Sequence, residues 1–356
     1  MRNVGGFIID TQRPLPYTPL QPITHVRISM VEEILTNIYK IEIPLPENPL
    51  KAINSYVLKD SARNLIIDTG LNRKECRDAM KAGLAELGIN LKKTDFFITH
   101  LHADHFALVP TLATDNSTIY FNQPDADRVR GGVPWDDMID YAGANGFPEK
   151  ELLAAIHNHP GYKYGSKFDV PLKILKEDDT IDIGEYQFKC VETPGHTLGH
   201  MCLYEPNKKI LVSGDHILGD ITPNIQSWAD EGNPLLQYLW SLDKVYELNV
   251  EVVLPGHRRI LKRCRERIQE LKDHHQNRAD EILTILKKGS RNAFQVASEM
   301  TWDISWESWD QFPVPQKWFA TGEAIAHLKY LLEKGMVSRE TLGGKLMYSL
   351  NAGPPT

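Results

Sequence analysis

Five short motifs constrain the fold of this chain more than any other feature of its sequence, because each stands where an apolar run ends in a loop. The motifs are IIDTG, ITHLH, TPGH, VSGD and LPGH, and their key residues are Asp68, His100, His196, Asp215 and His257. The apolar runs before them are typical of strands. Loops at strand ends are where α/β proteins gather functional groups from distant parts of the sequence. We therefore expect the five motifs to form one site.

The segments between the motifs alternate between expected strands and expected helices. Residues 53–60 and 64–70 are typical of neighbouring strands joined by a short turn. Residues 73–89 carry apolar side chains at helical spacing and end near a glycine, which predicts a helix. Residues 233–248 begin with Asn-Pro, the pattern of a helix N-cap followed by proline in the first turn. Strands and helices mixed in this order predict a layered α/β architecture.

The densest motif holds three histidines and an aspartate within six positions, His100, His102, Asp104 and His105. Imidazole and carboxylate suit zinc and, with less selectivity, manganese or iron. The side chains of the adjacent Asp104 and His105 would point in different directions, which favours two metal ions over one. A water molecule shared by two ions about 3.5–4 Å apart loses a proton near neutral pH and becomes a nucleophile. The pattern therefore predicts a dinuclear metal site.

The predicted ligands divide between the two ions. One ion takes His100, His102 and His196, the other takes Asp104, His105 and His257, and Asp215 bridges the two. In our interpretation Asp104 also holds the bridging hydroxide and passes its proton to the leaving group. His200 and His216 are expected beside the site as orienting or packing residues.

Composition sets the class of protein and excludes some partners. A length of 356 residues, 42% of them apolar, is enough for two domains with a real core. A net charge of −7 argues against nucleic acid and anionic membranes as partners. The four cysteines form no CxxC pair, and the sequence shows no signal-peptide pattern and no membrane-length apolar run. We therefore expect a cytoplasmic protein with reduced thiols.

The motifs THLHADH, TPGHT, SGDH and LPGH occur in the order found in the metallo-β-lactamase superfamily, and Asp68 matches its first acidic motif. Over about residues 30–260 the chain therefore resembles this superfamily. The resemblance implies an α/β fold of the αββα type, in which two mixed sheets lie back to back, with helices outside and two zinc ions at one edge. It also implies that Asp68 orients the histidine loop without binding a metal ion.

The residues after the last motif suggest a further, C-terminal domain. Expected helices are followed by a hairpin around Gly343 and Gly344, an order that resembles a winged helix. Such a tail on a lactamase-like core resembles the lactamase-β-2-like branch, which is grouped with glyoxalase II-type hydrolases. We expect an irregular arm at 1–28, a catalytic domain at 29–260, and a helical linker with a winged-helix-like domain at 261–356. This last domain is a candidate contact for a homo-oligomer.

Sequence details exclude some branches of the superfamily and leave others open. Flavodiiron proteins replace the second histidine of HxHxDH by glutamate, whereas His102 is present here. Large processing nucleases insert a domain between the last two motifs, whereas Asp215 and His257 are 42 residues apart. We predict a metal-dependent hydrolase of a small ester or thioester, of the acyl-CoA or glutathione type, with lactones and β-lactams left open. The alternatives are an iron persulfide dioxygenase, a single-strand endoribonuclease and a non-enzymatic regulatory protein that uses its tail.

Charge and aromatic residues indicate the substrate contacts. Between Arg258 and Lys288 there are ten basic and five acidic residues, whereas residues 290–356 hold six and seven. The tail is thus too weakly basic for a nucleic-acid surface. Arg258, next to a predicted ligand, is the expected anchor for an anionic small-molecule substrate. Two aromatic segments are expected to cover the site, and their candidate substrate contacts are Trp135, Tyr164 and Trp228.

Overall fold

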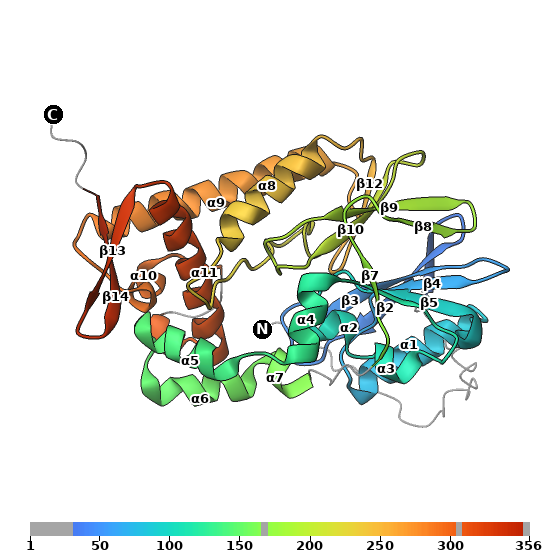
Figure 1. Cartoon of the computed structure of the whole chain (residues 1–356), viewed down its shortest axis with the longest axis horizontal. Helices are drawn as coiled ribbons and strands as arrows, with labels where there is room; N and C mark the ends of the chain where they lie inside the picture. The colour runs from blue at the N-terminus through green and yellow to red at the C-terminus, as the bar shows by residue number, and fades with distance from the viewer. Residues whose placement is uncertain (1–30, 165–169, 304–307, 352–356) are drawn as a thin grey trace, which may run out of the picture.

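A computed structural model of the protein describes residues 31–164, 170–303 and 308–351. The expected arm at 1–28 lies outside the described residues. Two β-sheets lie face to face in the larger part of the molecule, and helices cover both outer faces (Figure 1). This arrangement confirms the predicted αββα sandwich.

The first sheet has seven strands, which follow one another in the sheet as they do in the sequence. They are β1 (Val31–Leu35), β2 (Ile38–Pro44), β3 (Ala52–Leu58), β4 (Asn64–Ile67), β5 (Thr94–Phe97), β6 (Ile119–Asn122) and β7 (Lys173–Leu175). Strands β1 to β4 are antiparallel, and strands β4 to β7 are parallel. The two strands predicted at 53–60 and 64–70 are β3 and β4, and they pair as expected.

The second sheet has five strands in the order β12-β11-β10-β9-β8. They are β8 (Thr180–Ile183), β9 (Tyr186–Glu192), β10 (Met201–Glu205), β11 (Ile210–Gly214) and β12 (Val252–Pro255). Only the β11–β12 pair is parallel among them. Because β4 and β5 are parallel in one sheet and β11 and β12 in the other, the motifs that follow these strands reach the same edge of the sandwich.

Helices cover the two sheets and separate the strands along the chain. They are α1 (Lys74–Glu86), α2 (Ala103–Phe106), α3 (Val109–Leu112), α4 (Gln123–Gly131), α8 (Pro234–Tyr246) and α9 (Cys264–Leu286). The helix predicted at 73–89 is α1, and its buried side chains include Cys76, Met80 and Leu84. The helix predicted at 233–248 is α8, where the Asn233 side chain accepts a hydrogen bond from Leu236 N. Both sequence patterns therefore predicted the correct elements.

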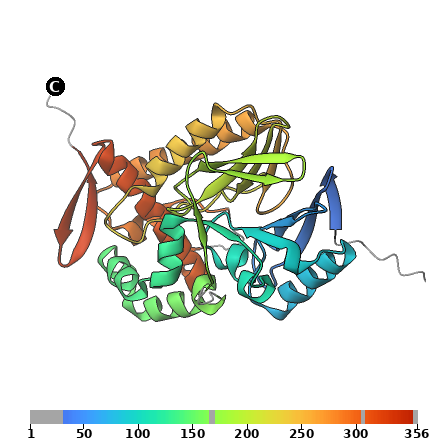
Figure 2. The same ribbon diagram turned by 45° about the vertical axis from the view of Figure 1, so that its right-hand side comes forward.

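The C-terminal region forms a second body of structure at one end of the sandwich (Figure 2). It contains α10 (Ala293–Glu299), α11 (Val314–Glu333) and the hairpin of β13 (Val337–Leu342) and β14 (Lys345–Leu350). Helices α5 (Trp135–Ala144) and α6 (Glu149–Asn158), which the sequence inserts between β6 and β7, lie against it. The order of two helices and a hairpin is the one predicted. The division of the chain at residues 28 and 260 stays a prediction.

A buried apolar cluster unites the inserted helices with the C-terminal region. Phe147, which follows α5, contacts Trp318 of α11 and Phe294 of α10 through ring edges at 5.6 and 5.3 Å between centroids. Its neighbour Asn145 accepts hydrogen bonds from Phe294 N and from the Tyr348 hydroxyl. The inserted helices are therefore part of the C-terminal core and are not a cover laid over the sandwich alone. Helix α7 (Pro160–Tyr164) continues from them and contacts α2.

None of the helices in the described part of the chain is both long enough and apolar enough to cross a membrane.

Candidate metal centre

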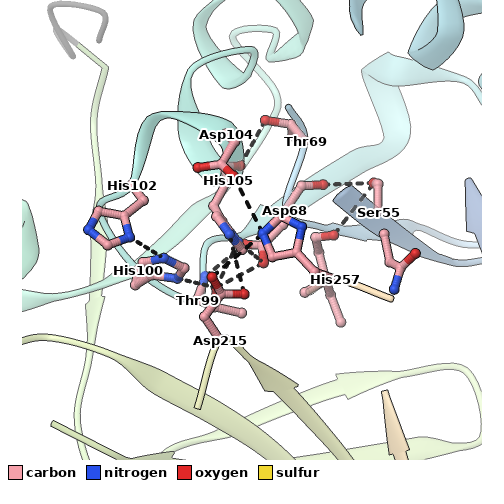
Figure 3. A network of polar contacts seen from close by, with 12 residues as sticks. Ser55, Asp68, Thr69, Thr99, His100, His102, Asp104, His105, Asp215 and His257 are labelled. Atoms are coloured by element: carbon pink, nitrogen blue, oxygen red, sulfur yellow. Dashed lines mark hydrogen bonds and ion pairs between the residues drawn. The ribbon is translucent and has the colours of Figure 1, made fainter. Parts of the chain in front are cut away.

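The structure brings the seven predicted metal ligands together at one edge of the sandwich, and Figure 3 labels six of them, all except His196. His100 and His102 lie in the loop after β5, and Asp104 and His105 lie on α2, which begins in that loop. His196 comes from the loop between β9 and β10. Asp215 and His257 follow β11 and β12 within two residues. The sequence elements that supply the side chains are thus far apart in the chain and adjacent in space.

Three groups of these side chains are compact enough to hold a metal ion. Within each group the possible ligand atoms all lie within 4.8 Å of one another. The groups are His100 with His102 and His196, His100 with His105 and Asp215, and Asp104 with His105 and His257. The first and the third are the two ligand sets that the sequence predicted.

Asp215 lies between these two sets. Its Oδ1 atom is 3.6 Å from His105 Nε2, and its Oδ2 atom is 3.6 Å from His196 Nε2 and 3.5 Å from His257 Nε2. The Asp215 backbone N–H donates to His200 Nε2 at 3.1 Å. The His200 Nδ1 atom in turn lies 2.7 Å from the Thr193 hydroxyl. Asp215 therefore faces histidines of both sets while its own backbone is held by a buried imidazole.

Hydrogen bonds at the outer nitrogens fix the orientation of the histidine rings. His196 Nδ1 donates to the Asn224 carbonyl at 2.9 Å, and His257 Nδ1 donates to the Ala52 carbonyl at 2.7 Å. His105 Nδ1 donates to Asp68 Oδ2 at 2.7 Å. Each bond leaves Nε2 of the ring directed toward the other ligands. This is the arrangement that neutral metal-binding imidazoles require.

Asp68 belongs to none of the three ligand groups and contacts the histidine loop from outside them. Its Oδ1 atom accepts from Thr99 N at 2.9 Å, and its Oδ2 atom accepts from the Thr99 hydroxyl at 2.8 Å and from His105. The Thr99 hydroxyl also lies 2.9 Å from His100 Nδ1. The Asp68 carboxylate thus holds His105 directly and His100 through the Thr99 hydroxyl, as Figure 3 shows.

Asp125 is a site residue that the sequence analysis missed. It lies on α4, is fully buried, and accepts hydrogen bonds from Leu101 N, Gly199 N and the Thr197 hydroxyl at 2.7–2.9 Å. Leu101 stands between His100 and His102, and Thr197 follows His196. Burial raises the pKa of Asp125 to about 6 although these donors oppose the shift. Its carboxylate therefore ties together the two loops that carry one complete histidine group.

The glycines of the motifs leave room for the ligands. A Cβ atom added at Gly256 would lie 2.6 Å from Asp215 Oδ1 and 2.8 Å from the His105 ring. A Cβ atom at Gly195 would lie 2.5 Å from the Tyr238 backbone of α8, and Gly195 has a positive φ of 144°. The glycines before His196 and His257 therefore follow from close packing around the site.

The donor atoms fit a divalent metal ion. His105 Nε2, His257 Nε2 and Asp215 Oδ1 are buried and have no hydrogen-bond partner among the described residues. Burial lowers the pKa of His105, but Asp68, Asp215 and Asp104 outweigh it and hold that pKa well above its usual value. Buried polar atoms without partners and a local excess of carboxylate charge are both relieved by a bound cation.

Burial also raises the pKa of Asp104, but the charges of His105 and of His257, whose Nε2 lies 3.4 Å from Asp104 Oδ2, outweigh it and lower that pKa to about 2. Burial lowers the pKa of His257, and Asp215 and Asp104 raise it above its usual value. Without a metal ion, these shifts favour ion pairs of His105 and His257 with the neighbouring carboxylates.

The predicted substrate contacts lie in several places. Arg258 follows His257, has a positive φ of 67°, and donates from Nη2 to the Pro49 carbonyl at 2.8 Å. Trp135 begins α5 and contacts the ring of His159 at 5.2 Å between centroids. Trp228 stacks on Trp318 of α11 at 3.8 Å. The Tyr164 side chain lies outside the described residues. Contact of these residues with a substrate stays a prediction.

A sequence model of the metallo-beta-lactamase superfamily matches residues 49–257. The chain belongs to the metallo-beta-lactamase superfamily. A second model, of the metallo-beta-lactamase-like C-terminal domain, matches residues 310–348, which include all of α11 and most of the hairpin. The resemblance found in the sequence motifs is thus confirmed for the sandwich, and the tail is of a kind found in this superfamily.

Relatives and solved structures agree with this assignment. The beta-lactamase-like protein 2 homolog of Caenorhabditis elegans is 26% identical over 294 residues, which cover 80% of this chain and 82% of the relative. An acyl-coenzyme A thioesterase of Gallus gallus is 28% identical over 215 residues, 57% of this chain and 72% of the relative. A crystal structure of a metallo-beta-lactamase family protein from Thermus thermophilus is 27% identical and covers 90% of this chain and 100% of that one, with a TM-score of 0.73.

Superfamily membership, named relatives and geometry together identify the class of protein. The chain is a hydrolase of the metallo-beta-lactamase superfamily, and its clustered histidines and aspartates could hold metal ions.

Proposed function

We propose that this hydrolase holds two divalent metal ions, preferably zinc, and cleaves small anionic thioesters. The observation that carries the proposal is the position of Asp215, whose two carboxylate oxygens face histidines of two different ligand sets. A single carboxylate placed in this way supports a pair of ions with a shared ligand. In the proposal one ion is held by His100, His102 and His196, and the other by Asp104, His105 and His257.

Two such ions would supply a Lewis acid for the thioester carbonyl and an acidified water molecule as the nucleophile. The residues of the chain supply orientation and proton transfer. Of the two carboxylates among the ligand candidates, Asp104 is the more exposed, with 16% of its side chain exposed against 8% for Asp215. We assign to Asp104 the acceptance of a proton from the attacking water and its delivery to the departing thiolate. We assign to Asp68 the orientation of His105 and of the Thr99 backbone.

The name of a relative supports the thioester as substrate. The Gallus gallus relative is called an acyl-coenzyme A thioesterase, and its similarity spans 57% of this chain. An acyl-CoA carries several negative charges, which agrees with the basic stretch that begins at Arg258. We therefore favour an acyl-CoA or a glutathione thioester over a lactone, a β-lactam or RNA.

The proposal is tested with metal-reconstituted protein and a panel of substrates. The panel contains acyl-CoA thioesters of several chain lengths, a glutathione thioester, matched oxygen esters, a β-lactam and single-stranded RNA. We expect the highest kcat/KM for a thioester and loss of turnover in Asp215→Asn with the fold retained. A folded, fully loaded enzyme that cleaves RNA or the β-lactam and leaves every thioester intact contradicts the proposal.

The proposed anchor is tested with two thioesters that share the acyl group. Arg258→Gln keeps a non-glycine residue at a positive φ and removes the charge. We expect a higher KM for the acyl-CoA and an unchanged KM for the acyl thioester of N-acetylcysteamine, which is neutral. Equal changes for the two substrates would show that Arg258 supports the loop next to His257 and does not contact the anion.

A further inference from the structure

The loop formed by residues 221–231 connects the metal centre to the C-terminal helix α11. At one end the Asn224 carbonyl accepts the hydrogen bond of His196 Nδ1 at 2.9 Å. The Asn224 side chain bonds in the other direction and donates from Nδ2 to Glu323 Oε2 of α11 at 3.2 Å. Asn224 is thus a direct link between a predicted metal ligand and a residue 99 positions later in the chain.

Further contacts hold the 221–231 loop on α11 over its length. Ser227 N donates to the Gly322 carbonyl at 3.0 Å, and Trp228 stacks on Trp318 at 3.8 Å with an interplanar angle of 18°. A Cβ atom added at Gly322 would lie 2.9 Å from atoms of Gln226 and Trp228. The loop therefore packs so closely on the helix that their backbones form a hydrogen bond and a side chain at Gly322 would not fit.

A buried lysine of α11 fixes the end of the loop. Lys329 is 7% exposed, and its Nζ donates to the carbonyls of Ala229, Asp230 and Glu231 at 2.8, 2.9 and 3.0 Å. An ammonium group that is taken out of water needs such acceptors, so these three carbonyls have little freedom to move.

Glu323 is itself held in place from the opposite side. Its side chain is 12% exposed, and its Oε1 atom accepts from Arg278 Nε of α9 at 3.3 Å. The Arg278 guanidinium lies 4.1 Å from the ring centroid of Trp302 and donates to the Thr301 carbonyl. A carboxylate fixed by this ion pair is a rigid acceptor for the Asn224 amide.

We propose that Glu323 is a positioning residue for the metal centre, which it reaches through Asn224 and His196. The inference rests on the proposed function in one respect, namely that His196 binds a metal ion. Glu323 fixes the Asn224 side chain, and the Asn224 carbonyl fixes the tautomer and the ring plane of His196. The C-terminal region is therefore part of the support of the metal site, in addition to any role of its own.

The test measures metal binding by the full chain and does not depend on turnover. The variants are Glu323→Ala, Asn224→Ala and the double variant, and the control is Glu333→Ala, which removes an exposed carboxylate from the same helix. Zn²⁺ affinity is measured on metal-free protein by competition with a chromophoric chelator. The absorption spectrum of the Co²⁺-loaded protein reports the geometry at each ion, and melting of the metal-free protein reports the fold.

We expect each single variant to weaken one Zn²⁺ equivalent by roughly 10–100-fold, the range for outer residues that orient a metal ligand. The other equivalent and the control should keep the wild-type affinity. Both residues act on the same ring, so their effects should not add. The double variant should bind Zn²⁺ about as tightly as the single variant with the lower affinity.

Unchanged Zn²⁺ affinity in folded Glu323→Ala overturns the inference, and so do strictly additive effects in the double variant. If Glu323→Ala does not fold, Asn224→Ala decides, since it removes the amide and leaves α11 intact. Equal weakening of both Zn²⁺ equivalents together with a lower melting temperature also contradicts positioning, because a general structural role predicts that result. A wild-type protein that binds no Zn²⁺, or cleaves no thioester, counts against the proposed function instead.

Discussion

A single carboxylate, Asp68, supports two histidines of the metal centre and does so from a strained backbone. Its φ is 55°, in the left-handed region, and its carbonyl is held by the Ser55 hydroxyl at 2.7 Å. Asparagine tolerates this conformation better than alanine. We therefore expect Asp68→Asn to weaken Zn²⁺ binding by roughly 10–100-fold. Its amide NH₂ would face a buried donor that Asp68 now accepts from, so the free energy of unfolding should also fall by about 1–3 kcal/mol. Asp68→Ala should lose a further ~1 kcal/mol of stability, and identical melting curves for the two variants would show that the backbone strain is unimportant.

Asp125 allows a second prediction at the scale of one residue. In Asp125→Asn an amide NH₂ replaces one of two oxygens that each accept from a buried donor, so a donor is left facing a donor. We expect the free energy of unfolding of the metal-free protein to fall by about 1–3 kcal/mol. The matched control is Asp127→Asn, on the exposed side of the same helix α4, with a change within about 0.5 kcal/mol. Denaturant unfolding that gives the same midpoint for both variants would contradict this role.

At the scale of elements, helix α8 sets the position of the loop that carries His196. Ser241 of α8 donates to the Pro194 carbonyl at 2.8 Å, and Gly195 has no room for a Cβ atom beside the Tyr238 backbone. Gly195→Ala should therefore displace the loop, lower the melting temperature and weaken Zn²⁺ binding. Gly143→Ala is the matched control, because its Cβ would meet only Leu152, at 3.9 Å, inside helix α5. Wild-type Zn²⁺ affinity in Gly195→Ala would mean that α8 does not constrain the loop.

At the scale of the whole molecule, metal binding and pH are coupled. The pKa values of His105 and His257 are raised by neighbouring carboxylates, so without a metal ion these imidazoles keep their protons to higher pH than an ordinary histidine does. Their protons must leave when a metal ion enters. We expect Zn²⁺ binding to release protons at pH 7, which calorimetry in buffers of different ionisation enthalpy measures. A binding enthalpy independent of the buffer would contradict the prediction.

The sign of the stability change with pH follows from the same groups. A raised imidazole pKa stabilises the metal-free fold fully below about pH 6.5, the unfolded value, and this stabilisation is lost as pH rises through the folded pKa. The chelated protein should therefore melt at lower temperature as pH is raised from 6.5, while the metal-loaded protein should not. Parallel melting curves against pH for the two forms would refute this account.

The residues that the sequence revealed and those that it concealed differ in a physical way. His100, Asp215 and the other ligand candidates have a fixed chemistry and stand at strand ends, so a local pattern identifies them. Asp125 and Glu323 hold loops that lie 74 and 99 residues away in the chain, and no local pattern records such a partner. The elements α1 and α8 were predicted from spacing and capping. The union of α5 and α6 with the C-terminal region was not, because apolar helix faces do not specify which partner covers them.

That shared core has a consequence for how the chain is made. Helices α5 and α6 leave the ribosome well before α10 and α11, yet the ring of Phe147 packs against Phe294 and Trp318 of these later helices. During translation their apolar faces stay exposed until α10 and α11 have been made. A chain whose synthesis stops before α10 would leave the apolar surface of α5 and α6 exposed. Exposed apolar surface of this kind is prone to aggregate and is bound by chaperones. We therefore expect synthesis of α11 to bury this apolar surface and to lower the risk of aggregation.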